Sequence, residues 1–237
     1  MGGAISRYMT DGQAPLQIRA TAPKEIPMGA PEDVTNALAA SCRGRDDVPT
    51  HPAGDLVAAA RTGDQDAWEQ LYRGIHRRLR GYVARRVGGE HVEDVMSETM
   101  TRAVAGLDRF DLRAAGFDGW VFGIARRVVF EHNRRVDTAR RRGRDVVAPV
   151  DTTTAGEAQP GDDLVLAAEY ARVRELFARL APAEQELLEL RVVAGLSADD
   201  VARVLGKRPG AVRTAQSRAL ANLRRLLEDD EKRTADD

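Results

Sequence analysis

Apolar residues recur at intervals of three and four through most of residues 54–229, and this spacing places them on one face of an α-helix. Glycine or proline interrupts the pattern between successive segments, and no segment alternates with the period of two that is typical of a strand. The pattern therefore predicts an all-α protein. Its longest segment, which follows Asp64, carries seven large apolar residues at helical spacing: Trp68, Leu71, Tyr72, Ile75, Leu79, Tyr82 and Val83.

Residues 54–144 are predicted to form four helices. A short helix precedes Gly63, and the long helix after Asp64 stops at Gly88 and Gly89. After a loop at residues 108–116, a fourth helix begins near Phe117 and runs into an arginine-rich end. The third helix is expected to bury one apolar side: Val92, Val95, Met96, Ala103, Val104 and Leu107.

A second helical block is predicted over residues 164–229. Residues 145–163, between the two blocks, are rich in proline, glycine and threonine and carry little that could be buried, so they are interpreted as a flexible linker. The expected architecture is two small helical domains, 54–144 and 164–229, joined by this linker.

The two ends of the chain show a different composition. Residues 1–53 hold several prolines and glycines without a sustained apolar period, which predicts a largely disordered extension. The pattern within residues 31–41 also allows a short helix. Residues 230–237 are interpreted as an acidic tail.

Composition excludes several classes of protein. The net charge of −1 gives no overall positive field, so any nucleic-acid surface must be local. A membrane span needs roughly 20 apolar residues in a row, far more than any run here, so no membrane insertion is expected. Cys42 is the single cysteine, which excludes an intramolecular disulfide. The four histidines are far apart in the sequence, and we expect an intracellular protein without metal or other cofactor.

The strongest local signal is a helix-turn-helix. Ser197–Leu205, a turn at Gly206–Arg208 and a helix over Pro209–Leu227 have the lengths of that motif. Between Arg203 and Arg225 there are seven basic residues and no acid. The inward side of the second helix is expected to hold Val212, Ala215, Ala219, Leu220 and Leu223. Its outward side holds Arg213, Thr214, Ser217 and Arg218. Because arginine binds guanine bidentately in the major groove, this pattern favours DNA binding over a merely solvated face.

Two further charged segments allow more than one interpretation. Residues 126–144 hold eight arginines, which could contact phosphates or form a solvated helix end. An acidic face carries Glu90, Glu93, Asp94 and Glu98, which alone is typical of an ordinary solvated surface. A catalytic role for these carboxylates has no support in the sequence, because there is no partner histidine at a suitable spacing and no glycine-rich phosphate loop. The sequence therefore indicates no enzyme and no small-molecule substrate.

Six segments occur in an order and spacing that resemble a known family: Ala67–Tyr72, Val92–Thr99, Leu107–Asp111, Phe117–Trp120, Ile124–Arg126 and Leu180–Leu227. The chain resembles bacterial RNA polymerase sigma factors of the sigma-70 family, in the extracytoplasmic-function (ECF) group, over about residues 55–228. The resemblance implies that residues 54–144 form a region 2 helical bundle and residues 164–229 a region 4 helix-turn-helix. It implies a sigma factor that binds core RNA polymerase, reads promoter −35 and −10 elements and assists DNA opening.

The resemblance also implies roles for particular residues. Docking on the β′ coiled coil of core polymerase is expected from Glu93, Asp94, Glu98 and Arg102. Binding of the −10 element is expected from Arg109, Phe110, Arg113, Arg126, Arg127, Arg134 and Arg135. Reading of the −35 element is expected from Arg208, Arg213, Thr214, Ser217 and Arg218. The loop Arg109–Gly116 would capture a flipped base, Trp120 would belong to the core, and region 4 would pack on the β flap.

The chain departs from the family pattern in a few places. Gly210-Ala-Val212 stands where Gly-Thr-Val is common, and Ala114–Ala115 occupy the base-capturing loop where polar residues are common. The family resemblance further implies an anti-sigma factor as a partner, besides core polymerase and promoter DNA, and a cytoplasmic location. The alternative is a stand-alone helix-turn-helix regulator, which would bind an operator without polymerase.

Overall fold

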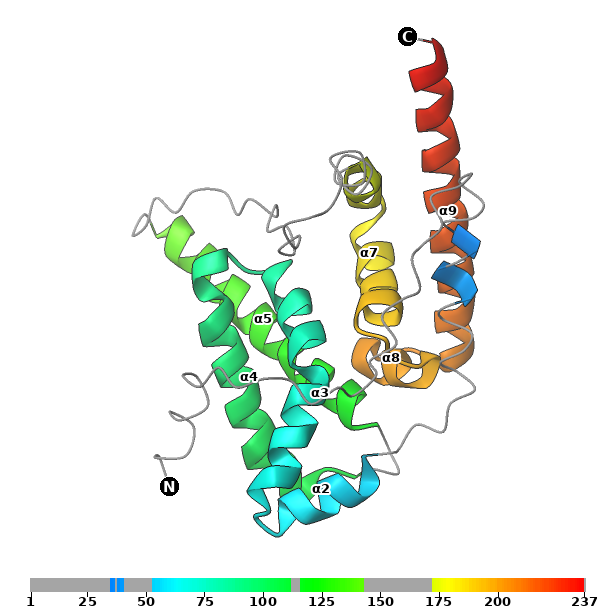
Figure 1. Ribbon diagram of the computed structural model, residues 1–237. Coiled ribbons are helices and arrows are strands. Elements are labelled where there is room, and N and C mark those ends of the chain that lie inside the picture. The colour runs from blue at the N-terminus through cyan, green and yellow to red at the C-terminus, as the bar shows by residue number, and fades with distance from the viewer. Residues whose placement is uncertain (1–34, 37, 41–52, 112–115, 143–171, 237) are drawn as a thin grey trace, which may run out of the picture.

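The computed structural model describes residues 35–36, 38–40, 53–111, 116–142 and 172–236, and every regular element within them is helical (Figure 1). The all-α prediction is confirmed. The predicted linker and most of the predicted N-terminal extension lie outside the described residues, as does the loop segment 112–115.

The first helical group comprises α2 to α5: α2 (Gly54–Arg61), α3 (Gln65–Ala84), α4 (Val92–Gly106) and α5 (Phe117–Arg141). Helix α3 begins after Asp64, whose carboxylate accepts a hydrogen bond of 3.1 Å from the Ala67 backbone amide and so caps the helix. Two short 3₁₀ turns flank α4, η2 (Gly89–His91) before it and η3 (Leu107–Arg109) after it.

Aromatic rings join α3, α5 and the segment that follows η3. The rings of Tyr82 and Phe122 meet edge to face at 5.5 Å, and Phe110 stacks on Trp120 at 4.5 Å. Trp120 is half-buried and packs against the core, in agreement with the prediction. One apolar prediction is wrong, because Val104 is 47% exposed. Val104 lies at the edge of the buried stripe of α4, where no other described element covers it.

The second helical group comprises a helical segment at residues 172–178, α7 (Pro182–Leu188), the π-helical turn η4 (Glu189–Val193), α8 (Ala198–Leu205) and α9 (Pro209–Asp236). Helix α8 is capped by Ser197, whose hydroxyl accepts from the Asp200 amide at 3.1 Å. It ends at Gly206, which adopts a φ of +65°. Both ends agree with the sequence pattern.

Helix α9 extends beyond the predicted end at Leu227 and includes most of the segment interpreted as an acidic tail. Leu227 is buried, and one turn further on Asp230 forms an ion pair with Arg172. These tertiary contacts stabilise the C-terminal part of α9, whose charged sequence did not predict a helix. Figure 1 shows its C-terminal turns projecting away from the other helices.

A buried arginine organises the second helical group. Arg191, in η4, is only 1% exposed. Its Nε donates to Gln216 Oε1 of α9 at 2.7 Å, and its Nη1 donates to the Leu196 carbonyl at 2.7 Å. One guanidinium therefore ties the π-helical turn both to α9 and to the loop that leads into α8.

A short piece of the N-terminal extension contacts α9. Residues 35–36 and 38–40 are helical, within residues 31–41, where the sequence pattern allows a short helix. Arg224 donates to the Thr35 hydroxyl at 2.9 Å and to the Asn36 side-chain oxygen at 3.2 Å. Within the described residues, no helix is both long enough and apolar enough to cross a bilayer.

Candidate functional site

A groove of about 740 Å³ runs between α4 and α5. It brings together two sets of residues that the sequence analysis assigned to different partners. From α4 come three predicted polymerase-binding residues: Asp94, Glu98 and Arg102. From α5 come two predicted DNA-binding residues, Arg134 and Arg135. The other lining residues are Val95, Val128, Glu131 and His132.

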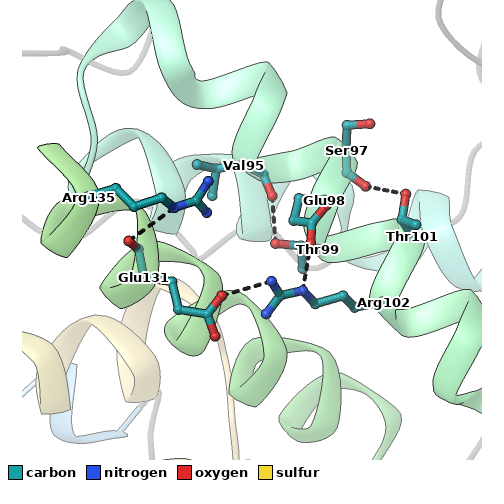
Figure 2. Close-up of polar contacts among 8 residues, drawn as sticks. All are labelled: Val95, Ser97, Glu98, Thr99, Thr101, Arg102, Glu131 and Arg135. Carbon is teal, nitrogen blue, oxygen red and sulfur yellow. Dashed lines mark hydrogen bonds and ion pairs between the residues drawn. The ribbon is translucent and has the colours of Figure 1, made fainter.

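Arg102 links the two walls of this groove, as Figure 2 shows. Its Nε donates to Glu98 Oε1 at 2.7 Å, and its Nη2 donates to Glu131 Oε2 at 2.8 Å. Hydrogen bonds to Glu131 and Glu98 raise the pKa of Arg102, and the same contact with Arg102 lowers the pKa of Glu131. The separation of four residues between Glu98 and Arg102 is visible in the sequence, but the contribution of Glu131 is not.

Glu93 lies apart from this groove. Its carboxylate pairs with Arg80 Nε of α3 at 3.1 Å, and its side chain is 51% exposed. The four residues predicted to bind polymerase thus divide into three that line the groove and one on the neighbouring surface towards α3.

Two histidines that are distant in the sequence meet in the structure, and one of them, His132, lines the groove. The rings of His91 and His132 lie 4.7 Å apart, because α5 packs alongside η2 and α4. Burial, followed by the neighbouring His91 and Arg135, lowers the pKa of His132. In the part of the chain that the structure describes, no group of three or more histidine, cysteine or acidic side chains could hold a metal ion.

The predicted −10 residues occupy unequal positions. Arg109, Arg127, Arg134 and Arg135 are exposed, whereas Arg113 lies outside the described residues. Phe110 is only 5% exposed and packs on Trp120 and Phe117, so its ring is part of the core and is not on the surface.

Arg126 is engaged by a residue that no pattern in the sequence singles out. Its Nε and Nη2 donate to the two carboxylate oxygens of Glu186, on α7, at 2.8 and 3.3 Å. The hydrogen bond to Glu186 raises the pKa of Arg126. A second unpredicted feature is Phe130, which is 66% exposed and lies one helical turn from Arg126 and from Arg134.

The buried and exposed sides of α9 are arranged as the sequence pattern predicts. Val212, Ala219 and Leu223 are at most 1% exposed, and Leu220 is also buried. The residues expected to face outward are all exposed: Arg208, Arg213, Thr214, Ser217 and Arg218. The hydroxyls of Thr214 and Ser217 donate to the carbonyls of Gly210 and Arg213 in the preceding turn, which leaves their oxygen atoms able to accept from a ligand. Arg213 lies 3.8 Å from the carboxylate of Asp199 at the start of α8.

Comparison with known proteins identifies the family to which this chain belongs. A family model described as ECF sigma factor matches residues 52–232, so the chain belongs to the ECF sigma factors. The resemblance seen in the sequence is confirmed.

Individual relatives agree with this assignment. The ECF RNA polymerase sigma factor BldN of Streptomyces coelicolor is 34% identical over 177 residues, which cover 74% of this chain and 66% of BldN. SigD of Mycobacterium tuberculosis, another ECF RNA polymerase sigma factor, is 33% identical over 177 residues, which cover 71% of this chain and 81% of SigD.

Two solved structures share the fold. CnrH in complex with the cytosolic domain of CnrY gives a TM-score of 0.51 at 26% identity, over 74% of this chain and 96% of that one. The sigma factor RpoE from Bartonella quintana, in complex with the anti-sigma factor NepR, gives a TM-score of 0.53 at 22% identity, over 68% of this chain and 96% of that one. At that lower identity the second likeness concerns the fold alone.

Proposed function

We propose that this sigma factor binds core RNA polymerase through the acidic wall of the α4–α5 groove and reads promoter DNA with α5 and α9. The observation that carries the proposal is the groove itself. The family resemblance implies that some residues bind polymerase and that others bind the −10 element. These two sets lie on opposite walls of the groove. Bound polymerase would therefore sit beside the promoter segment that is to be opened.

The polymerase-binding role rests on two exposed carboxylates of α4, one of which is held by an ion pair. Asp94 and Glu98 lie on the same side of α4, one helical turn apart, and Arg102 holds Glu98 in place. Charges arranged in this way favour a basic partner surface and set its orientation more than its affinity. We propose the β′ coiled coil as that partner, and the β flap as the partner of the second helical group.

The −10 role rests on the exposed face of α5. Arg127 and Arg134 present guanidinium groups that can neutralise phosphates. Phe130 lies between them, and an exposed ring flanked by cations can stack on an unpaired base. Opening of the DNA would be driven by binding energy from such captured bases, without any catalytic residue.

The −35 role rests on α9. A helix-turn-helix places the N-terminal half of its second helix in the major groove, and this half of α9 carries Arg213, Thr214, Ser217 and Arg218 on its open face. We propose regions 2 and 4 for the first and second helical groups, with residues 145–163 as the connection between them.

We further propose an anti-sigma factor as a regulatory partner in the cytoplasm. The support is the membership of the chain in the ECF sigma factor family, together with the description of CnrH in complex with the cytosolic domain of CnrY. No small-molecule substrate or cofactor is required by this function.

Run-off transcription tests the proposed function. Purified core polymerase and a pool of genomic promoters are assayed with and without the protein. Discrete new start sites that depend on the added chain are expected. Promoter binding in the absence of polymerase, with no added transcripts, would instead support the stand-alone regulator.

Arg213→Ala is expected to reduce discrimination at one position of the −35 element by roughly 1–3 kcal/mol, because a bidentate contact to one base is lost. The measurement is sequence preference in a randomised promoter library with holoenzyme. Arg225→Ala, which removes the same charge further along the exposed side of α9, serves as the control and should leave the preference unchanged. An unaltered preference in Arg213→Ala would contradict the assignment.

A further inference from the structure

The described part of the N-terminal extension lies beside α9 (Figure 1). Thr35 is only 2% exposed, and Leu38 and Ala39 pack against the hydrophobic core. These residues precede the part of the chain that matches the ECF sigma factor family, residues 52–232. The contact is therefore an addition to the helix-turn-helix, made by a segment from outside the family domain.

The contact is centred on Arg224, a half-buried residue of α9. Its Nε donates to Thr35 Oγ1 at 2.9 Å, and its Nη2 donates to Asn36 Oδ1 at 3.2 Å. Because a guanidinium is planar, two bonds to different nitrogen atoms fix both its position and its orientation. The side chain has thus lost much of its rotamer freedom on folding, before any ligand binds.

Both acceptors of Arg224 are uncharged, which distinguishes it from other arginines of the second helical group. Arg203 pairs with the carboxylate of Asp200 at 2.9 Å, and Arg172 pairs with that of Asp230. Among the described residues, no carboxylate forms an ion pair with Arg224. A neighbouring carboxylate offsets the field of a guanidinium, whereas neutral oxygens hold the group and leave its positive charge to attract an anion.

Arg224 lies on the same face of α9 as two residues proposed to read the −35 element. It follows Arg213 by eleven residues and Ser217 by seven, which are close to three and two turns of an α-helix. Seven residues of helix rise about 10 Å, and the major groove is about 12 Å wide. With Ser217 at the bases, Arg224 would therefore lie at the phosphates that border the groove.

We propose that Thr35 and Asn36 are positioning residues for a contact between Arg224 and a phosphate of the DNA backbone. A segment that precedes the family domain would then take part in binding of the −35 element. This inference rests on the proposed −35 role of α9. A phosphate contact carries no sequence information itself, but it fixes the register and orientation of the protein on the duplex.

The test uses the full-length chain and a fluorescent DNA duplex of mixed sequence, titrated at several salt concentrations. Arg224→Ala should reduce the slope of log affinity against log salt concentration by about 0.9, the value for one phosphate contact. Thr35→Val with Asn36→Ala should lower the affinity roughly three- to tenfold, because binding must then order the freed arginine. Thr35→Ser keeps the hydroxyl and should bind like the wild type. The control is Thr234→Val, the same change at an exposed position near the end of α9, which should also leave binding unchanged.

A double-mutant cycle separates positioning from a merely structural role. Once Arg224→Ala has removed the positioned group, adding Thr35→Val with Asn36→Ala should not weaken DNA binding further. Equal losses with and without Arg224 would overturn the proposal, and so would a gain in affinity when the two side chains are removed. Should circular dichroism show that the double variant does not fold, Asn36→Ala alone replaces it, since Asn36 is exposed.

Arg213→Ala in the same titration distinguishes a failure of this inference from a failure of the proposed function. If Arg213→Ala reduces the salt slope and Arg224→Ala does not, only the role of Arg224 and its two positioning residues is rejected. If neither variant changes the slope, the −35 role of α9 is rejected together with the inference. The titration needs no polymerase, so both outcomes stay separate from the result of run-off transcription.

Discussion

Arg191→Ala should lower the free energy of unfolding by about 3 kcal/mol, because two buried acceptors lose their donor at about 1–3 kcal/mol each. These acceptors are Gln216 Oε1 and the Leu196 carbonyl, each 2.7 Å from the guanidinium. The loss should be larger than for any exposed arginine, since Arg191 is 1% exposed and lies where η4, the α8 loop and α9 meet. Denaturant unfolding followed by circular dichroism gives the measurement.

Two variants sharpen this test. Arg174→Ala removes an exposed arginine from the same helical group and should change stability by less than about 0.5 kcal/mol. Arg191→Lys keeps the charge but cannot serve both acceptors with a planar fork, so it should fall between the wild type and alanine. A stability of Arg191→Ala within 1 kcal/mol of the wild type, on the same order as a surface change, would show that the buried network contributes little.

The second large effect is expected for the double variant Asp94→Arg with Glu98→Arg. Juxtaposed like charges cost several kcal/mol at an interface, which corresponds to a loss of roughly a hundredfold or more in affinity for core polymerase. Stability should change little, because both side chains are exposed and a surface pair such as Glu98–Arg102 contributes about 0–1 kcal/mol. Affinity is measured by fluorescence anisotropy with purified core enzyme.

The control reverses two exposed acids elsewhere, in Asp229→Arg with Glu231→Arg on α9. It makes the same change in net charge but leaves the α4–α5 groove intact, so polymerase binding should be retained. Equal affinity of both double variants for core enzyme would remove the groove from the proposed interface.

The sequence by itself determined the helices and the inner and outer sides of α9. Helical spacing and capping residues are local properties, which is why Asp64, Ser197 and Gly206 mark the observed helix ends. The split between buried Val212 and exposed Arg213 follows from the same periodicity. A helix that packs through a single stripe of apolar residues shows that stripe in its sequence, whatever the neighbouring helices are.

Only the tertiary structure decided which charges meet. Glu131 reaches Arg102 across 29 positions, Glu186 reaches Arg126 across 60, and His91 reaches His132 through the packing of α5 beside η2 and α4. The partner of a polar side chain cannot be predicted from the periodicity of the sequence. A solvated carboxylate and a carboxylate in an ion pair both occupy polar positions of the helical pattern. Val104 illustrates the converse, since an apolar residue at the edge of a stripe is buried only if another element covers it. The positions and ends of the helices therefore follow from local spacing in the sequence, whereas the groove and the contact between the two helical groups depend on how the helices pack.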